Sequence, residues 1–133
     1  MKKSILLLTT LFASILFSGC GNKHSQLKIE NLSTDEISQI TILTLEACEM
    51  IEVTNMEQIQ YILDVMHQLS LFVKSDHKPT YNTELIQYTL HTAANESLTI
   101  DLLDTCIGYN NNWYLCDPSV YNMLNDIAYC YLP

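Results

Sequence analysis

Residues 84–103, ELIQYTLHTAANESLTIDLL, decide the fold of this chain. Apolar side chains occupy every second position in both halves of the stretch, at Ile86, Tyr88 and Leu90 and then at Leu98, Ile100 and Leu102. Successive side chains of a strand point to opposite faces of a sheet, so the alternation predicts two antiparallel strands with one shared buried face. The two apolar sets meet only in an even register, such as Leu90 opposite Ile100 or Leu102. An odd register would place Asp101 opposite Leu90 on the buried face.

Two strands and a helix are predicted on the N-terminal side of this hairpin. QITILTL (residues 39–45) and MIEVT (residues 50–54) are rich in β-branched residues, and the polar stretch EACE between them predicts a turn. Thr54 and Glu57 then have the spacing of a capping box, which marks the start of a helix. The apolar stripe of this predicted helix is Ile59, Ile62, Leu63, Met66 and Leu69.

A hairpin and a second helix are predicted on the C-terminal side. CIGYNNNWYLC (residues 106–116) has the pattern of a tight hairpin around Asn110 to Asn112, because asparagine tolerates positive φ. Asp117 is expected to cap a helix that begins at Pro118. The core stripe of that helix is Val120, Leu124, Ile127 and Tyr131.

The order of these elements predicts the fold class. Strands that pair antiparallel, with one helix inside their sequence and one after it, are typical of an α+β domain. We therefore expect a two-layer α+β fold, with an antiparallel sheet of about five to six strands and two helices packed on one face. Residues 39–133 are assigned to this single domain.

The first twenty residues have the organisation of an export signal. Lys2 and Lys3 precede an apolar run over residues 5–17. The run is shorter than the roughly 20 apolar residues that cross a bilayer, and it fits the apolar region of a secretory signal. Residues 1–19 are therefore predicted to be a signal peptide.

The run ends in Phe17-Ser18-Gly19-Cys20, which resembles the lipobox of bacterial lipoproteins, although Phe17 replaces the usual aliphatic residue. The resemblance implies cleavage between Gly19 and Cys20 and attachment of a diacylglycerol to the Cys20 sulfur. Two acyl chains anchor a protein far better than one. Residues 20–38 would then be the lipidated cysteine and a tether. The expected location is the bacterial cell membrane, lipid-anchored on its extracytoplasmic face.

The mature chain is strongly acidic. Without residues 1–19 it keeps four lysines and no arginine against fifteen acidic residues, a formal charge of −11. This charge excludes nucleic acid as a partner, since such binding depends on cationic contacts to phosphate. It would accelerate the encounter with a cationic peptide or protein ligand; the simpler interpretation is that it only maintains solubility.

Four cysteines remain besides Cys20. An even number in an exported domain indicates disulfides. A three-residue loop at Asn110 to Asn112 would place Cys106 directly opposite Cys116 and allow that bond, whereas a two-residue turn would forbid it. Cys48 and Cys130 would then pair with each other. The alternative is four free, mostly buried thiols.

No catalytic, cofactor or metal motif is recognisable in the chain. His91 and Asp101 would face each other in one even register, but no nucleophile, phosphate-binding loop or zinc-type cysteine spacing accompanies them. We therefore predict a protein that is not an enzyme, with no catalytic residues, no cofactor and no metal site.

An aromatic cluster is the candidate interaction surface. Tyr109, Trp113 and Tyr114 surround the polar turn, and aromatic residues often anchor interfaces; the alternative is that they only stabilise the sheet. The stretch IGYNNNWYLCDPSVYNMLNDI, with its Tyr121 and Leu124 pattern, resembles small Gram-positive lipoproteins of unknown function.

These observations predict a non-catalytic binding module on the outer face of the membrane, with a protein or peptide ligand. One alternative is an immunity or inhibitor lipoprotein that sequesters cationic antimicrobial peptides. Another is that the released signal fragment, which ends in FASILFSG, acts as a peptide pheromone, by analogy with some lipoprotein signals.

Overall fold

The structure, a computed structural model, describes residues 28–69, 71, 74–76, 79 and 84–130. The predicted signal peptide, the cleavage site between Gly19 and Cys20, the lipidation site and the first part of the tether lie outside the described residues. Tyr131, predicted for the core stripe of the last helix, also lies outside them.

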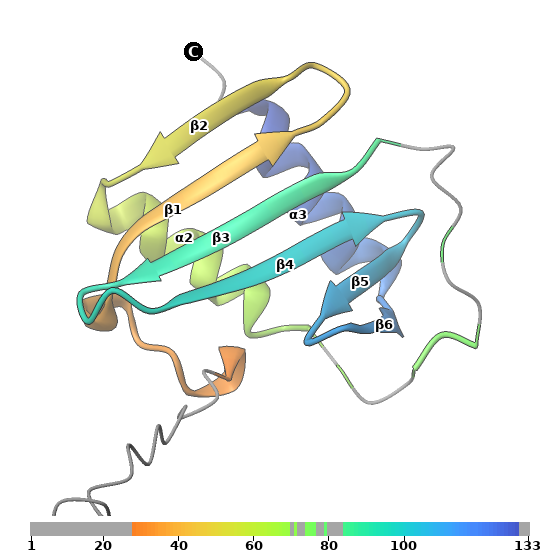
Figure 1. Cartoon of the computed structure of the whole chain (residues 1–133), viewed down its shortest axis with the longest axis horizontal. Helices are drawn as coiled ribbons and strands as arrows, with labels where there is room; N and C mark the ends of the chain where they lie inside the picture. The colour runs from red at the N-terminus through yellow and green to blue at the C-terminus, as the bar shows by residue number, and fades with distance from the viewer. Residues whose placement is uncertain (1–27, 70, 72–73, 77–78, 80–83, 131–133) are drawn as a thin grey trace, which may run out of the picture.

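Six antiparallel strands form one sheet in the order β2-β1-β3-β4-β5-β6 (Figure 1). Their bounds are β1 Ile37–Thr44, β2 Glu49–Val53, β3 Ile86–Thr92, β4 Ser97–Leu103, β5 Cys106–Tyr109 and β6 Asn112–Leu115. The strands follow the chain order except that β1 lies between β2 and β3. The chain passes from β2 to β3 through a crossover that contains α2, the first of the two long helices.

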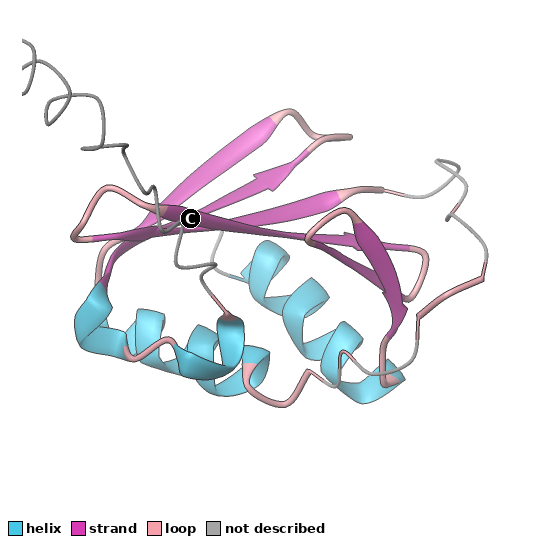
Figure 2. Ribbon diagram, turned by 60° about the horizontal axis from the view of Figure 1, so that its bottom comes forward, coloured by secondary structure: helices cyan, strands magenta, loops and turns pink. Residues whose placement is uncertain are grey.

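Two helices, α2 (Met56–Met66) and α3 (Pro118–Cys130), pack on one face of the sheet, and Figure 2 shows the two layers edge-on. The other face, which we call the open face, has no helix over it in the described part of the chain. The predicted α+β fold, with two helices on one side of an antiparallel sheet, is therefore confirmed.

The buried faces of the elements follow the predicted patterns. Ile86, Tyr88 and Leu90 are buried on β3, as are Leu98, Ile100 and Leu102 on β4. Four residues of the predicted stripe on α2 and three on α3 are also buried against the sheet: Ile59, Ile62, Leu63 and Met66, then Val120, Leu124 and Ile127. The residues that alternate along the strands and those at helical spacing on the helices thus pack together in one core.

The pairing of β3 with β4 is even, as predicted, but Leu90 lies opposite Leu98. Ile100 and Leu102, which were given as examples of an even partner for Leu90, lie opposite Tyr88 and Ile86. The reason is the connection: Thr92 to Glu96 form a tight turn in which the Thr92 N–H donates to the Glu96 carbonyl at 2.9 Å. This short turn moves the pairing toward the residues nearest to it.

The helix caps lie close to the predicted positions. Asn55 caps α2, because its side-chain oxygen accepts hydrogen bonds from the N–H groups of Glu57 and Gln58 at 2.9 and 3.2 Å. The prediction of Thr54 as the cap was wrong by one residue. Asp117 caps α3 as predicted, with its Oδ1 accepting from the Ser119 N–H at 2.8 Å.

The domain begins earlier than residue 39. Short 3-10 turns at η1 (Ile29–Asn31) and η2 (Thr34–Glu36) precede β1. Ile29, Leu32 and Ile37 are buried in the core, and the ring of His67 hydrogen-bonds the Leu32 carbonyl at 3.1 Å. Residues 28–38, predicted as the end of the tether, are thus part of the folded domain.

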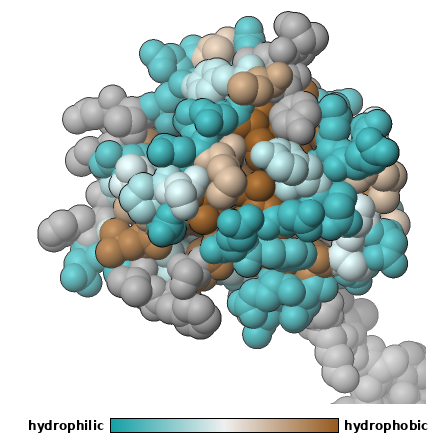
Figure 3. All heavy atoms as spheres, turned by 180° about the vertical axis from the view of Figure 1, so that it is seen from behind, coloured by the Kyte–Doolittle hydropathy of each residue, from teal (hydrophilic) through white to brown (hydrophobic). Residues whose placement is uncertain are grey.

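Seen from the helix side, the surface is mostly hydrophilic, with a band of apolar side chains between the polar ones (Figure 3). Met56, Tyr61 and Tyr129 are the large apolar residues that α2 and α3 expose. Neither these helices nor any other in the described ranges combines the length and apolarity that crossing a membrane requires.

Candidate functional site

The turn between β5 and β6 determines the geometry of the candidate site. Tyr109 pairs with Asn112, so the turn contains only Asn110 and Asn111. Both have positive φ, 49° and 61°, as a type I′ hairpin turn requires. Of the two turn lengths that the sequence left open, the two-residue turn is the one present, and Asn112 is the first residue of β6.

The two-residue turn separates the predicted aromatic cluster. Trp113 lies opposite Gly108, on the open face, whereas Tyr114 lies opposite Ile107, which is buried in the core. Tyr109 packs against the core as well. Of the three aromatic residues predicted to form one surface, Trp113 alone projects from the open face.

The same turn changes the cysteine geometry. Leu115, and not Cys116, lies opposite Cys106, so the direct opposition that favoured a Cys106–Cys116 bond was a wrong prediction. All four cysteines in the described ranges are free thiols: Cys106 buried, Cys116 half-buried, and Cys48 and Cys130 exposed. Burial raises the pKa of the Cys116 thiol to about 11, and the nearby Asp117 carboxylate adds to the shift. The two disulfide pairings stay predictions.

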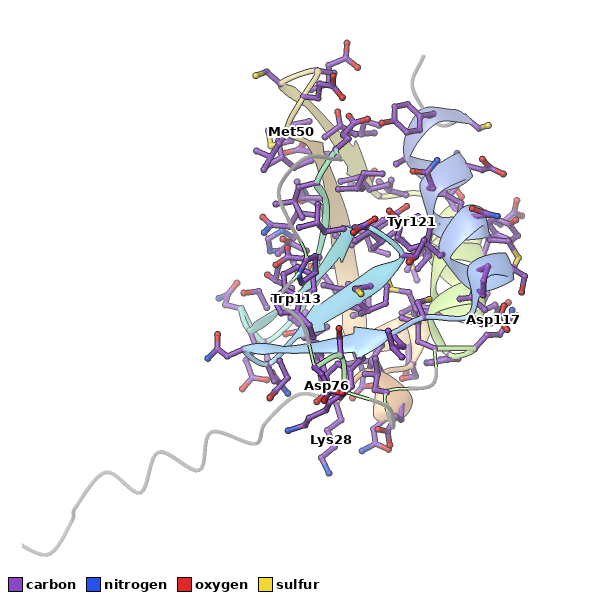
Figure 4. All side chains as sticks on the ribbon, turned by 90° about the vertical axis from the view of Figure 1, so that its right-hand side faces the viewer. Lys28, Met50, Asp76, Trp113, Asp117 and Tyr121 are labelled. Atoms are coloured by element: carbon purple, nitrogen blue, oxygen red, sulfur yellow. The ribbon has the colours of Figure 1, made fainter. Side chains whose placement is uncertain are left out.

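A cleft of about 690 Å³ opens on the open face beside this hairpin. Its walls are formed by Ser75, Thr99, Asp101, Gly108, Trp113 and residues 109–112. Figure 4 shows Trp113 on the opposite side of the sheet from Asp117 and Tyr121, which lie at the helix layer. Among the described residues, the cleft wall thus combines two aromatic residues, Tyr109 and Trp113, with one carboxylate and several amide and hydroxyl groups.

The tryptophan ring covers Gly108. A Cβ atom on Gly108 would lie 3.0 Å from Cη2 and Cζ3 of Trp113 and 3.1 Å from Cβ of Asp101. Any larger side chain would therefore push the ring away from β5. An isolated glycine in a strand often marks such a close approach, and this was the signal in the sequence that could have indicated the site.

Among the described residues of the cleft wall, Asp101 supplies the only carboxylate. It lies on β4, opposite Gln87 on one side and Gly108 on the other. The Gln87 Nε2 donates to Asp101 Oδ1 at 2.8 Å, which orients the carboxylate without neutralising it. Sequence reasoning missed Asp101 and Gln87 as site residues, because their meeting with Trp113 depends on the register of three strand pairs.

The rim of the cleft is held by residues 74–76. The Ser75 N–H donates to the Trp113 carbonyl at 2.8 Å, and Lys74 forms an antiparallel bridge with Tyr114. The Lys74 Nζ donates to Asn112 Oδ1 at 3.1 Å. This segment therefore holds the backbone of β6 in place and fixes one end of the cleft.

His91 does not face Asp101. It lies opposite Ser97 on β4, and its Nε2 is 3.0 Å from Thr41 Oγ1 on β1. The pairing considered from the sequence was wrong because the β3–β4 register places Asp101 opposite Gln87, four pairs away from His91. The described residues hold no group of three or more His, Cys, Asp or Glu side chains with the geometry of a metal site.

No family model matches this chain, and no curated protein or solved structure matches it either.

Proposed function

We propose that this chain is a lipid-anchored, extracytoplasmic binding protein whose ligand is a cationic peptide. The observation that carries the proposal is the Asp101 carboxylate beside the Trp113 ring in the open-face cleft. A lysine or arginine side chain of the ligand is proposed to enter between them.

This pair of groups suits a cation. A tryptophan face attracts an ammonium or guanidinium group through its quadrupole, and a carboxylate forms charge-assisted hydrogen bonds with the same group. The partner of Asp101 that the described residues supply is the neutral amide of Gln87, which leaves the carboxylate able to accept a cationic group. The amides of Asn110, Asn111 and Asn112 line the same cleft and offer hydrogen bonds to a peptide backbone.

The whole chain supports the same ligand class. The mature sequence carries four lysines against fifteen acidic residues, and a field of this sign speeds the encounter with a cation. Anionic membrane lipids also attract polybasic peptides, so an acidic protein anchored at Cys20 would compete for them where they accumulate. Sequestration of cationic antimicrobial peptides is the biological form of this activity that we propose.

The test is a titration of the full chain in detergent with pentalysine, followed by the fluorescence of its single tryptophan. Asp101→Asn should weaken binding by about tenfold, the loss expected for one charge-assisted hydrogen bond. The matched control is Asp126→Asn, which removes the same charge from an exposed position on α3. This variant should bind within about twofold of wild type, because exposed distant charges are screened.

Two outcomes would overturn the proposal. Equal losses in both variants would show that pentalysine responds only to net charge and not to the cleft. Stronger binding of a neutral oligosaccharide such as chitotriose, insensitive to salt, would show that the ring and amides recognise a sugar and not a cation.

A further inference from the structure

The two edges of the sheet differ in a way that the cleft does not explain. β2 is the outermost strand on one side and pairs with β1 alone among the described strands, from Val53 opposite Ile40 to Glu49 opposite Thr44 (Figure 1). Its outer edge therefore presents backbone N–H and carbonyl groups with no described strand beside them. Such an edge is a template for another strand.

The opposite edge is covered. Residues 74–76 run along β6, where Ser75 donates to the Trp113 carbonyl and Lys74 forms a bridge with Tyr114. Proteins commonly protect an edge strand by such a covering segment, by a lysine, by a proline or by a bulge. β2, with the sequence EMIEV, contains neither lysine nor proline. Among the described residues, the edge of β2 is therefore the one with no segment paired to it.

The side chains of β2 differ between its two faces. Met50 and Glu52 lie on the open face, with Met50 64% exposed. Ile51 and Val53 point to the helix face, where Val53 is buried and Ile51 packs against the core. An added strand would therefore extend the core with apolar residues on one face and meet a glutamate on the other.

The negative charge near this edge distinguishes two possible occupants, a second copy of this chain and a basic strand from another molecule. Glu49 and Glu52 are both exposed, and Glu46 lies in the adjoining turn. A second copy of the chain would bring these glutamates together along one short seam, and like charges facing each other across strands are destabilising. A basic strand would meet them favourably, since opposite charges across strands are stabilising.

We propose that the outer edge of β2 binds an extended peptide in which basic and apolar residues alternate, by addition of a seventh strand to the sheet. The main-chain hydrogen bonds supply affinity, and the alternating side chains supply specificity. This edge lies at the opposite end of the sheet from Trp113, so the inference is independent of the proposed cleft ligand.

The test measures hydrogen exchange of the full chain in detergent with a peptide of alternating lysine and valine residues. The amides of residues 49–53 that point outward should exchange at least about tenfold more slowly when the peptide is bound. The matched control peptide has the same side chains with every backbone amide N-methylated, which removes the donors that strand addition requires. It should give no protection of β2.

Protein variants distinguish binding at the β2 edge from binding in the cleft. Glu49→Gln with Glu52→Gln, both at exposed positions, should weaken the protection of β2 at least about fivefold without unfolding the domain. Asp101→Asn should leave that protection unchanged. Equal protection by the N-methylated peptide, or protection that appears only in β5 and β6, would overturn the strand-addition proposal while leaving the cleft proposal to its own titration.

Discussion

At the residue scale, the Tyr88 hydroxyl is the most deeply buried polar side-chain group of β3. Its ring is fully buried in the core, and its hydroxyl donates to the Leu124 carbonyl of α3. Burial raises the pKa of this phenol well above its ordinary range, so the hydroxyl stays neutral. The bond therefore joins the central sheet to the last helix inside an apolar environment.

We expect Tyr88→Phe to lower the free energy of unfolding by about 1 kcal/mol, the net value of one buried hydrogen bond. The loss is not larger because the Leu124 carbonyl keeps its partner one helical turn further along α3. Urea denaturation followed by circular dichroism measures it. Tyr61→Phe, at a tyrosine 48% exposed on α2, is the control and should change stability by less than about 0.5 kcal/mol.

The thiols differ in their expected reactivity. The thiolate is the nucleophile, so a thiol with a pKa of about 11, such as Cys116, is nearly all protonated at pH 8. We expect iodoacetamide at pH 8 to modify the exposed Cys48 and Cys130 first. Cys116 should react at least about tenfold more slowly, and the buried Cys106 more slowly still.

Peptide mapping by mass spectrometry measures these rates residue by residue. The reactivity of Cys116 should rise steeply as the pH approaches 11, because its raised pKa means that deprotonation occurs only there. The contrary result would come from a chain isolated from an oxidising compartment. If Cys106 and Cys116 both resisted alkylation until a reductant was added, the free thiols would be contradicted and the disulfide predicted from the sequence would be established.

At the element scale, the β5–β6 hairpin depends on two residues with positive φ. Asn111 has φ 61°, whereas Asn112 belongs to β6 and pairs with Tyr109. A β-branched residue is strongly disfavoured in the left-handed region and favoured in a strand. We expect Asn111→Val to destabilise the domain by about 1–2 kcal/mol.

The matched variant Asn112→Val should change the unfolding free energy by about 0.5 kcal/mol or less, since it loses only exposed hydrogen bonds. Urea midpoints of the two variants, measured side by side, decide the turn length. A larger loss at Asn112 than at Asn111 would contradict the two-residue turn and favour the three-residue loop that the sequence also allowed.

The elements themselves were predictable, because periodicity reports which face of a strand or helix is buried. The alternating residues of β3 and β4 lie in the core as expected, and so do the described stripe residues of α2 and α3, although Leu69 after α2 is only partly buried. Register was less predictable: any even pairing buries Leu90, and the short turn after Thr92 selects Leu98 as its partner. The cap of α2 was similarly ambiguous, because Thr54 and Asn55 are both good caps.

The candidate site was harder to predict than the fold. Trp113 was recognisable as a candidate site residue from its type and its position near a polar turn. Its neighbours were not, because Asp101 and Gly108 are joined to it only through the β4–β5 and β5–β6 pairings. A change of one residue in the turn moves Trp113 to the other face of the sheet, and no local pattern distinguishes the two cases.

At the scale of the whole molecule, the two faces of the sheet differ in what covers them. The helices bury one face and stabilise the domain, while the open face presents Trp113 and Asp101 near one end and Met50 at the other (Figure 4). The first folded residue is close to the predicted anchor, since Ile29 is already buried in the core. Anchored at Cys20, the domain would therefore lie near the bilayer surface.

The anchor is tested by feeding cells an alkyne-tagged fatty acid and measuring its incorporation into the chain. Wild type should carry the label and begin at Cys20 by intact mass, whereas Cys20→Ala should carry none, because the thioether at Cys20 is the expected point of attachment. Cys48→Ala is the control; Cys48 is an exposed thiol within the domain, and its loss should leave labelling unchanged. Label on Cys20→Ala, or an unlabelled wild type, would contradict the lipid anchor. Labelling that disappears only with Cys20 would mean that the acidic domain acts at the membrane surface, where capture of a cationic peptide has the greatest effect on the cell.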